Sequence, residues 1–302
     1  MGTAPAILIR PRAVLILGRV SNLPTVLSNA LAGIILSGGG QGIGSADAVR
    51  ALLAALLALV LFYIGGMYLN DAMDVEIDTR ERPGRPIPKG DASRAAVFTT
   101  GFALLGLGLA LAAAAGPRAG VAAGALVGAI LLYDWIHKRT AAAPLVMGLC
   151  RLLCYGTAAA MAGGRLDAPG LWIGGTGLFC LVVGLTYAAR QEAYDRLGAA
   201  WPLAVLAMPL IIAIGAALTG QGAVPLALAS SLALGLACAA GLRRFFRRAP
   251  GDVPRAVALL IAAIALYDAA LIAAAGGDVA AVAVAVLCFP LTLILQRVIP
   301  GT

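Results

Sequence analysis

Tyr68-Leu-Asn70-Asp71-Ala-Met-Asp74-Val-Glu76-Ile-Asp78 closes a long apolar run that spans residues 49–70. Spacings of three and four place Asp71, Asp74 and Asp78 on one face of a helix, with Asn70 beside them, while Glu76 points away. Carboxylates gathered on one stripe repel one another unless a cation neutralises them. Hard oxygen ligands suit Mg²⁺, which is usually held by a few carboxylates together with substrate phosphates. The stretch therefore predicts a site for a metal-bound phosphate group at the end of a buried helix.

The composition places this helix in a membrane. The chain has 302 residues, of which 61% are apolar and 12% charged, and its mean hydropathy is +0.96. Apolar runs of roughly 17 to 25 residues recur, each long enough to cross a ~30 Å hydrocarbon core as a helix. We expect a single all-α domain, 1–302, built as a polytopic transmembrane helical bundle of nine or ten spans. The ten expected spans are 12–37, 49–70, 93–115, 119–135, 141–163, 171–193, 201–219, 223–242, 256–274 and 279–297.

Loop charge predicts the orientation of the bundle, because cytoplasmic loops are enriched in Lys and Arg. Most of the 22 basic residues fall on the N-terminal side and in alternate loops, whereas the opposite loops hold only Arg50, Arg118 and Arg165. Both termini are therefore expected to be cytoplasmic. This asymmetry also accounts for the net charge of +8, so no nucleic-acid partner is expected. A basic face would instead attract anionic membrane lipid and diphosphate groups.

The acidic stretch and the residues after it resemble the first signature of the UbiA superfamily of intramembrane prenyltransferases, Asn-Asp-x-x-Asp-x-x-x-Asp followed by an Arg-Pro-rich loop. Asn70, Asp71, Asp74 and Asp78 match every position. Two further segments are similar to the family's opening helix and to its Tyr-x-x-x-x-Lys-Arg segment, namely Arg19-Val-Ser-Asn22-Leu-Pro24 and Tyr133-Asp-Trp-Ile-His-Lys138-Arg139. In detail the first motif looks most like the EboC-type branch. The resemblance implies a bundle of typically nine spans around a central cavity and transfer of a prenyl group from a polyprenyl diphosphate.

A second acidic motif of this family matches less well. In one branch it reads Asp-x-x-Tyr-Ala-x-Gln-Asp-x-x-x-Asp, and alignment on Tyr187 puts Gly184 and Gln191 at the first two aspartates. Asp195 matches the last, and Glu192 offers a displaced carboxylate. Either Arg190 replaces part of the metal's charge and grips the diphosphate, or the site keeps binding without catalysis. Ordinary helix-end charges, paired at Glu192 and Arg196, are a third interpretation.

The resemblance implies roles for the matched residues, with Mg²⁺ as cofactor. Asn70, Asp71, Asp74 and Asp78 would hold the metal against the diphosphate, with Glu192 and Asp195 as a weaker second site. Asp71, Asp74, Lys138 and Tyr133 are the candidate catalytic residues. Substrate binding falls to the polar residues that match or flank these motifs: Asn22, Asn70, Arg82, Arg85, Arg139, Arg151, Tyr187 and Arg190. The acceptor would be aromatic or otherwise lipophilic.

Three further features leave alternatives open. Arg151 lies deep in the fifth expected span, where a lone charge needs a partner, and the diphosphate and Asp268 are both candidates. His137 is interpreted as an interfacial side chain, not a catalytic one. Small residues such as Gly124 and Gly128 suit close helix packing. A transporter would also need intramembrane acids and a basic face. Gly184 and Gln191 favour a third class, a non-catalytic lipid-binding subunit, which Mg²⁺-dependent diphosphate release would separate from an enzyme.

Overall fold

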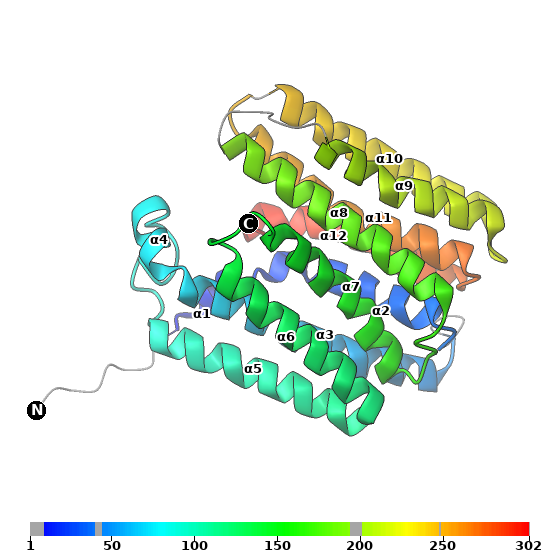
Figure 1. Cartoon of the computed structure of the whole chain (residues 1–302), viewed down its shortest axis with the longest axis horizontal. Coiled ribbons are helices and arrows are strands. Elements are labelled where there is room, and N and C mark those ends of the chain that lie inside the picture. Colours follow the sequence, from blue (N-terminus) through cyan, green and yellow to red (C-terminus); the bar gives the residue numbers. More distant parts are fainter. Residues whose placement is uncertain (1–8, 40–43, 194–200, 248, 302) are drawn as a thin grey trace, which may run out of the picture.

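The fold is a bundle of helices that run side by side, with their connections gathered at two ends (Figure 1). The computed structural model describes residues 9–39, 44–193, 201–247 and 249–301, without the side chains of residues 189–193, 202 and 203. The described residues contain no strand, only a single antiparallel bridge between Ile9 and Ala92. The helices are α1 Pro11–Leu17, the 3₁₀ helix η1 Val20–Asn22, α2 Leu23–Leu36, α3 Ala46–Met73, α4 Val75–Glu81, α5 Arg94–Ala115, α6 Pro117–Ile136, α7 Ala143–Met161, α8 Pro169–Ala193, α9 Trp201–Thr219, α10 Val224–Arg247, α11 Asp252–Ala274 and α12 Val279–Val298.

The expected membrane spans are present as helices. Within the described residues, eight helices are long and apolar enough to cross a membrane, and the bent pair Pro11–Leu17 and Val20–Leu36 makes a ninth. The seventh expected span, 201–219, corresponds to α9, where the shorter apolar helix Ala204–Thr219 is described. The all-α, multi-pass membrane architecture is thereby confirmed. The cytoplasmic location of both termini stays a prediction from loop charge.

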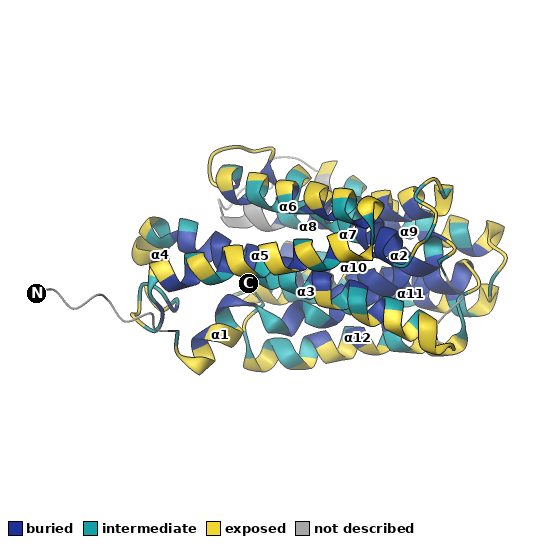
Figure 2. Ribbon diagram, turned by 90° about the horizontal axis from the view of Figure 1, so that it is seen from below, coloured by how far each residue is buried: buried dark blue, intermediate teal, exposed yellow. Residues whose placement is uncertain are grey.

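Burial separates an inner layer from an outer one. α11 and α2 are buried along most of their length, whereas α5, α6 and α12 carry exposed stripes (Figure 2). The exposed stripes are apolar and include Leu107, Val121 and Leu287, as expected of surface that faces lipid tails. Polar residues therefore concentrate inside the bundle and at the helix ends.

The first expected span, 12–37, is broken instead of continuous. The segments Pro11–Leu17 and Val20–Leu36 meet at 51°, and Arg19 adopts a left-handed conformation with φ 42°. Pro24 explains part of this break, because its ring lacks an N–H and clashes with the carbonyl of the preceding turn. A broken helix at membrane depth is tolerated where it lines a cavity. Here the break carries Arg19 and Asn22 to the wall of the cavity described below.

α2 and α7 approach each other closely at Gly33. A Cβ atom built on Gly33 would lie 2.6 Å from the backbone oxygen of Tyr155 and 2.8 Å from its Cα. No side chain fits there, so glycine permits the contact. One turn away on each helix, the same approach brings Asn29 against Arg151.

The packing role expected for Gly124 and Gly128 is wrong. A Cβ on either glycine would meet nothing within 4 Å, because α6 turns Ala123 and Leu126 inward and leaves the two glycines on its exposed face.

The two kinds of glycine give a paired test. Gly33→Ala should lower the free energy of unfolding by about 1–3 kcal/mol, the usual effect of overpacking. Gly128→Ala should be neutral or slightly stabilising, because alanine favours the helix. Thermal unfolding of the detergent-purified protein measures both, and equal effects would contradict the close contact.

Candidate active site

A cavity of about 380 Å³ opens within the bundle. Most of its charged lining residues come from helix ends and connections, namely Arg19, Arg82, Arg85 and Asp134, whereas Arg151 comes from the middle of α7. Its apolar lining residues come from helix interiors, chiefly α3, α6, α8 and α11. They are Leu59, Phe62, Leu126, Ile130, Val182, Leu185, Val257, Ile261 and Ile264. The cavity therefore has a charged mouth and an interior that is apolar except at Arg151, and an amphiphile with an ionic head suits this division.

The three motif aspartates lie on the buried side of the helix end. α3 ends at Met73, Asp74 joins it to α4, and the backbone N–H of Asp78 donates to the Asp74 oxygen, so the helical path is nearly continuous. Asp71, Asp74 and Asp78 are 4%, 7% and 3% exposed, whereas Glu76 is exposed. The single acidic face predicted from the spacing is confirmed.

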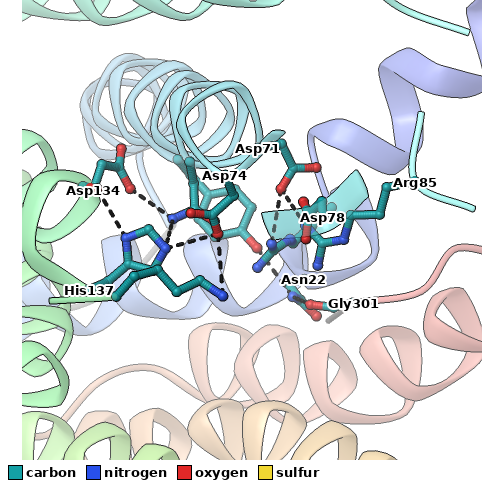
Figure 3. A network of polar contacts seen from close by, with 12 residues as sticks. Asn22, Asp71, Asp74, Asp78, Arg85, Asp134, His137 and Gly301 are labelled. Atoms are coloured by element: carbon teal, nitrogen blue, oxygen red, sulfur yellow. Dashed lines mark hydrogen bonds and ion pairs between the residues drawn. The ribbon is translucent and has the colours of Figure 1, made fainter. Parts of the chain in front are cut away.

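Arginines neutralise two of these carboxylates. Arg85 donates from Nη1 to Asp71 at 2.6 Å and lies 3.4 Å from Asp78 Oδ2, so one guanidinium bridges both groups (Figure 3). Arg19 reaches the same Asp71 oxygen at 3.3 Å. Burial raises the pKa of Asp78 above its ordinary value; Arg85 offsets part of that effect, and the neighbouring Asp71 and Asp74 add to it. An added cation beside Asp78 would therefore favour its charged form.

Asp74 has a different set of partners. Oδ2 of Asp74 lies 2.9 Å from His137 Nε2 and 3.7 Å from Lys138 Nζ. Burial would raise the pKa of Asp74, but the His137 hydrogen bond and the charges of His137, Lys138 and Arg85 hold it below its ordinary value. His137 is buried, at 7% exposure, so its interpretation as an interfacial side chain is wrong. The Nδ1–H of His137 donates to the backbone oxygen of Asp134 at 3.0 Å, which directs Nε2 toward Asp74.

Asp134 belongs to the cluster although the motifs did not point to it. It is 4% exposed, it lines the cavity, and its Oδ1 accepts a hydrogen bond of 3.1 Å from Asn70 Nδ2. Its Oδ2 is buried without a hydrogen-bond partner among the described residues. Because Asp134 engages the amide nitrogen of Asn70, the Asn70 amide oxygen is turned away from it. A buried acid one residue after Tyr133, in an otherwise apolar helix, was the available signal.

Asn22 is held in place by the C-terminal segment. It donates to the backbone oxygen of Gly301 at 2.9 Å and to Tyr63 at 3.2 Å, and it accepts from Gln296 at 2.9 Å. Gly301 itself lines the cavity. Residues close to both ends of the chain thus meet at the site (Figure 3).

The other predicted residues fall into two groups. Arg82 and Tyr133 line the cavity, and Tyr133 stacks on His137 with ring centroids 5.2 Å apart. Arg139 packs over Trp135 instead, and Tyr187 donates to the backbone oxygen of Ala141 at 2.6 Å. Neither Arg139 nor Tyr187 is among the residues that line the cavity.

Much of the second motif lies outside the residues that the structure describes. Asp195, like the rest of residues 194–200, is among the residues that the structure does not describe, and so are the side chains of Arg190 and Glu192. The roles predicted for these residues remain predictions.

The donor chemistry of the first motif fits a hard divalent cation. Its oxygens are buried, numerous and negatively charged, and Asn70 adds a neutral amide oxygen. Among the described residues, no three acidic, histidine or cysteine side chains converge closely enough to hold a metal alone. Arg85 pairs with Asp71 and Asp78, whereas His137 and Lys138 pair with Asp74. The set therefore fits a cation that takes part of its coordination from a phosphate ligand, as Mg²⁺ often does.

Comparison with known proteins assigns the family. Residues 26–260 match the model of the UbiA prenyltransferase family. The chain belongs to the UbiA prenyltransferase family. The fold agrees, with a TM-score of 0.66 at 20% identity to a UbiA homologue from Aeropyrum pernix, over 84% of this chain and 98% of that one. A UbiA homologue from Archaeoglobus fulgidus, solved with GPP and Mg²⁺ bound, gives a TM-score of 0.58 at 15% identity, over 86% of this chain and 99% of that one.

Curated relatives of this UbiA-family chain include two archaeal digeranylgeranylglyceryl phosphate synthases. The enzyme from Ignicoccus hospitalis is 37% identical over 40% of this chain and 37% of its own length. That from Methanopyrus kandleri is 33% identical over 54% of this chain and 57% of its own length. Membership of the EboC-type branch stays a prediction.

The Arg85–Asp71 contact should contribute measurably to stability. A double-mutant cycle with Arg85→Ala and Asp71→Asn should give a coupling energy of roughly 1–3 kcal/mol, because both side chains are largely buried. The exposed Arg10–Asp91 pair, at a similar distance of 2.8 Å, is the matched control and should couple by less than about 1 kcal/mol. Unfolding measurements in detergent give both energies, and equal couplings would contradict the argument from burial.

Proposed function

We propose that this protein is a Mg²⁺-dependent prenyltransferase that moves a prenyl group from a polyprenyl diphosphate to an aromatic or other lipophilic acceptor, with the whole chain, 1–302, acting as one unit. The observation that carries the proposal is the position of Asp71, Asp74 and Asp78. They lie buried beside a cavity that is ionic at its mouth and apolar within. An allylic diphosphate has the same division into an ionic head and an apolar chain. The names of the curated relatives make a prenylated glyceryl phosphate one acceptor to test.

Binding of the diphosphate would be the task of the charged mouth. Asn70, Asp71, Asp74 and Asp78 would hold Mg²⁺, and the relative from Archaeoglobus fulgidus that was solved with GPP and Mg²⁺ makes this metal the first to test. Bound Mg²⁺ supplies charge neutralisation to a departing diphosphate. Arg85 would exchange its carboxylate partners for phosphate oxygens, to which a guanidinium binds in the same forked geometry. Arg82 and Lys138 would add positive charge around the leaving group.

Stabilisation of the reacting carbon would be the task of the interior. As the allylic carbon–oxygen bond breaks, positive charge develops on the prenyl group. The apolar walls formed by residues such as Phe62, Ile130 and Val182 would exclude water from that carbon until the acceptor attacks it. Tyr133, stacked on His137 at the cavity wall, would contact the diphosphate end of the prenyl substrate.

The acidic cluster provides the first test of this function. Asp71→Ala and Asp74→Ala should each reduce Mg²⁺-dependent diphosphate release from a labelled prenyl diphosphate by about 100-fold or more, since each removes charge stabilisation at the leaving group. Glu76→Ala is the matched control, because Glu76 belongs to the same acidic run but is exposed on the other face. Its activity should stay within about twofold of wild type. Persistent turnover in Asp71→Ala, or an equal loss in Glu76→Ala, would rule out the proposed role of the cluster.

The incomplete second motif gives another test. Because Gly184 and Gln191 replace two expected aspartates, the first motif must carry more of the metal binding. The fold-loss of turnover in Asp195→Asn should therefore be smaller than the fold-loss in Asp71→Asn by a factor of at least about ten. Turnover is measured at saturating Mg²⁺. Equal losses would show that both motifs contribute equally. Binding of prenyl diphosphate without any release would instead favour a non-catalytic lipid-binding subunit.

A further inference from the structure

A second polar network lies deeper in the bundle, away from the motif carboxylates. Asp268 of α11 is fully buried, and its carboxylate accepts hydrogen bonds from Ser28, Asn29 and Tyr155. Asn29 donates to Asp268 through Nδ2 at 2.8 Å and accepts from Arg151 Nη1 through Oδ1 at 2.8 Å. The amide thus stands between the two charges, in the one orientation that satisfies both.

Arg151 and Asp268 do not form a direct ion pair. Thr25, at 3.3 Å, is the second acceptor for Arg151 Nη1. The other guanidinium nitrogens of Arg151, Nε and Nη2, have no hydrogen-bond partner in the described part of the chain. Asp268 compensates the charge of Arg151 through Asn29, which lowers the penalty for a cation at this depth. Donors remain available for a ligand.

Arg151 is also one of the residues that line the cavity. Arg151 lines it together with Cys150 and Cys154, and its guanidinium lies over the ring of Tyr63, 5.6 Å from the centroid. Tyr63 is eight residues before Asp71 in α3, and Arg151 is eight residues after Ala143 in α7. At a helical rise of 1.5 Å per residue, the backbone at Tyr63 lies roughly 12 Å along α3 from that at Asp71, and Arg151 lies beside Tyr63. Arg151 therefore lies deeper in the bundle than the motif carboxylates.

We propose that Arg151 forms a second anion subsite in the membrane-embedded part of the cavity and binds an anionic group of the acceptor. Identification of the ligand as the acceptor substrate rests on the proposed function, whereas the anion subsite itself rests on the contacts of Arg151. It deepens that function by naming the chemistry of the second substrate: a lipophilic molecule that carries a phosphate or carboxylate. The anion would meet the guanidinium fork, and Asn29 and Thr25 would keep the fork turned toward it. Donor and acceptor would then bind at different depths of one cavity.

Binding of a simple amphiphile tests the subsite without turnover. We would measure equilibrium binding of radiolabelled decyl phosphate and of decanol, an uncharged molecule with the same chain, to the full-length protein in detergent with EDTA. Arg151→Gln should weaken binding of decyl phosphate about tenfold or more, the usual effect of losing a charge-assisted contact, and should leave binding of decanol unchanged. Arg151→Lys keeps the charge without the fork and should fall between wild type and Arg151→Gln.

Arg85→Gln is the matched control at the mouth of the cavity and should leave the affinity for decyl phosphate within about twofold. A loss in Arg85→Gln with none in Arg151→Gln would overturn the proposal, because the anion would then bind with the motif carboxylates. An equal loss for decanol in Arg151→Gln would also overturn it, because Arg151 would then only maintain the cavity's shape.

A wild-type measurement separates the two possible sources of the anion and needs no variant. In the presence of Mg²⁺, inorganic diphosphate has no chain to occupy the interior, so it should not displace bound decyl phosphate. Displacement would assign the subsite to the donor's diphosphate and overturn the proposal. If turnover is absent but Arg151-dependent binding of decyl phosphate persists, the subsite stands and the prenyltransferase function fails.

Discussion

Buried negative charge must be compensated, and this constraint organises the structure. Asp71, Asp74 and Asp78 end an apolar helix, are almost fully buried, and repel one another. Their compensation comes from three separate parts of the chain: Arg19, Arg85, and the adjacent pair His137 and Lys138. The break between α1 and α2, the loop after α4 and the end of α6 are therefore tied to one point. The contacts of the three carboxylates thus hold these segments of the bundle together.

The same rule operates in the interior, with a different solution. There the charges of Arg151 and Asp268 are joined through the amide of Asn29, and neutral donors saturate the carboxylate. At the mouth, by contrast, arginine contacts carboxylate directly. A direct pair leaves few donors available. A pair joined through an amide, as Asn29 joins Arg151 and Asp268, is called a relay below, and it keeps the guanidinium accessible. The difference between the two clusters is thus a difference in what each can still bind.

The sequence predicted the membrane fold and the acidic face because both depend on local periodicity. Apolar runs identify spans without any tertiary information, and spacings of three and four place Asp71, Asp74 and Asp78 together on any helix. The burial of His137 and the contact of Asp134 with Asn70 depend instead on how α6 meets α3, which no local pattern encodes. The packing role predicted for Gly124 and Gly128 was wrong for the same reason. Their spacing shows that the two glycines share a helix face, but not whether that face meets a neighbouring helix. Prediction of the relay through Asn29 would have required the register of α2 against α7, which is set by the close contact at Gly33.

The relay also constrains the order in which the chain can be assembled in a membrane. Synthesis proceeds from the N-terminus, so α2 enters the bilayer before α7, and α11 follows much later. An arginine at the centre of a helix raises the free energy of insertion by about 2.5–3.5 kcal/mol. When α7 inserts, Asn29 and Thr25 are already present to accept from Arg151, whereas Asp268 has not yet been made. The chain order thus makes neutral acceptors on α2 available to Arg151 before its counter-charge on α11 has been synthesised.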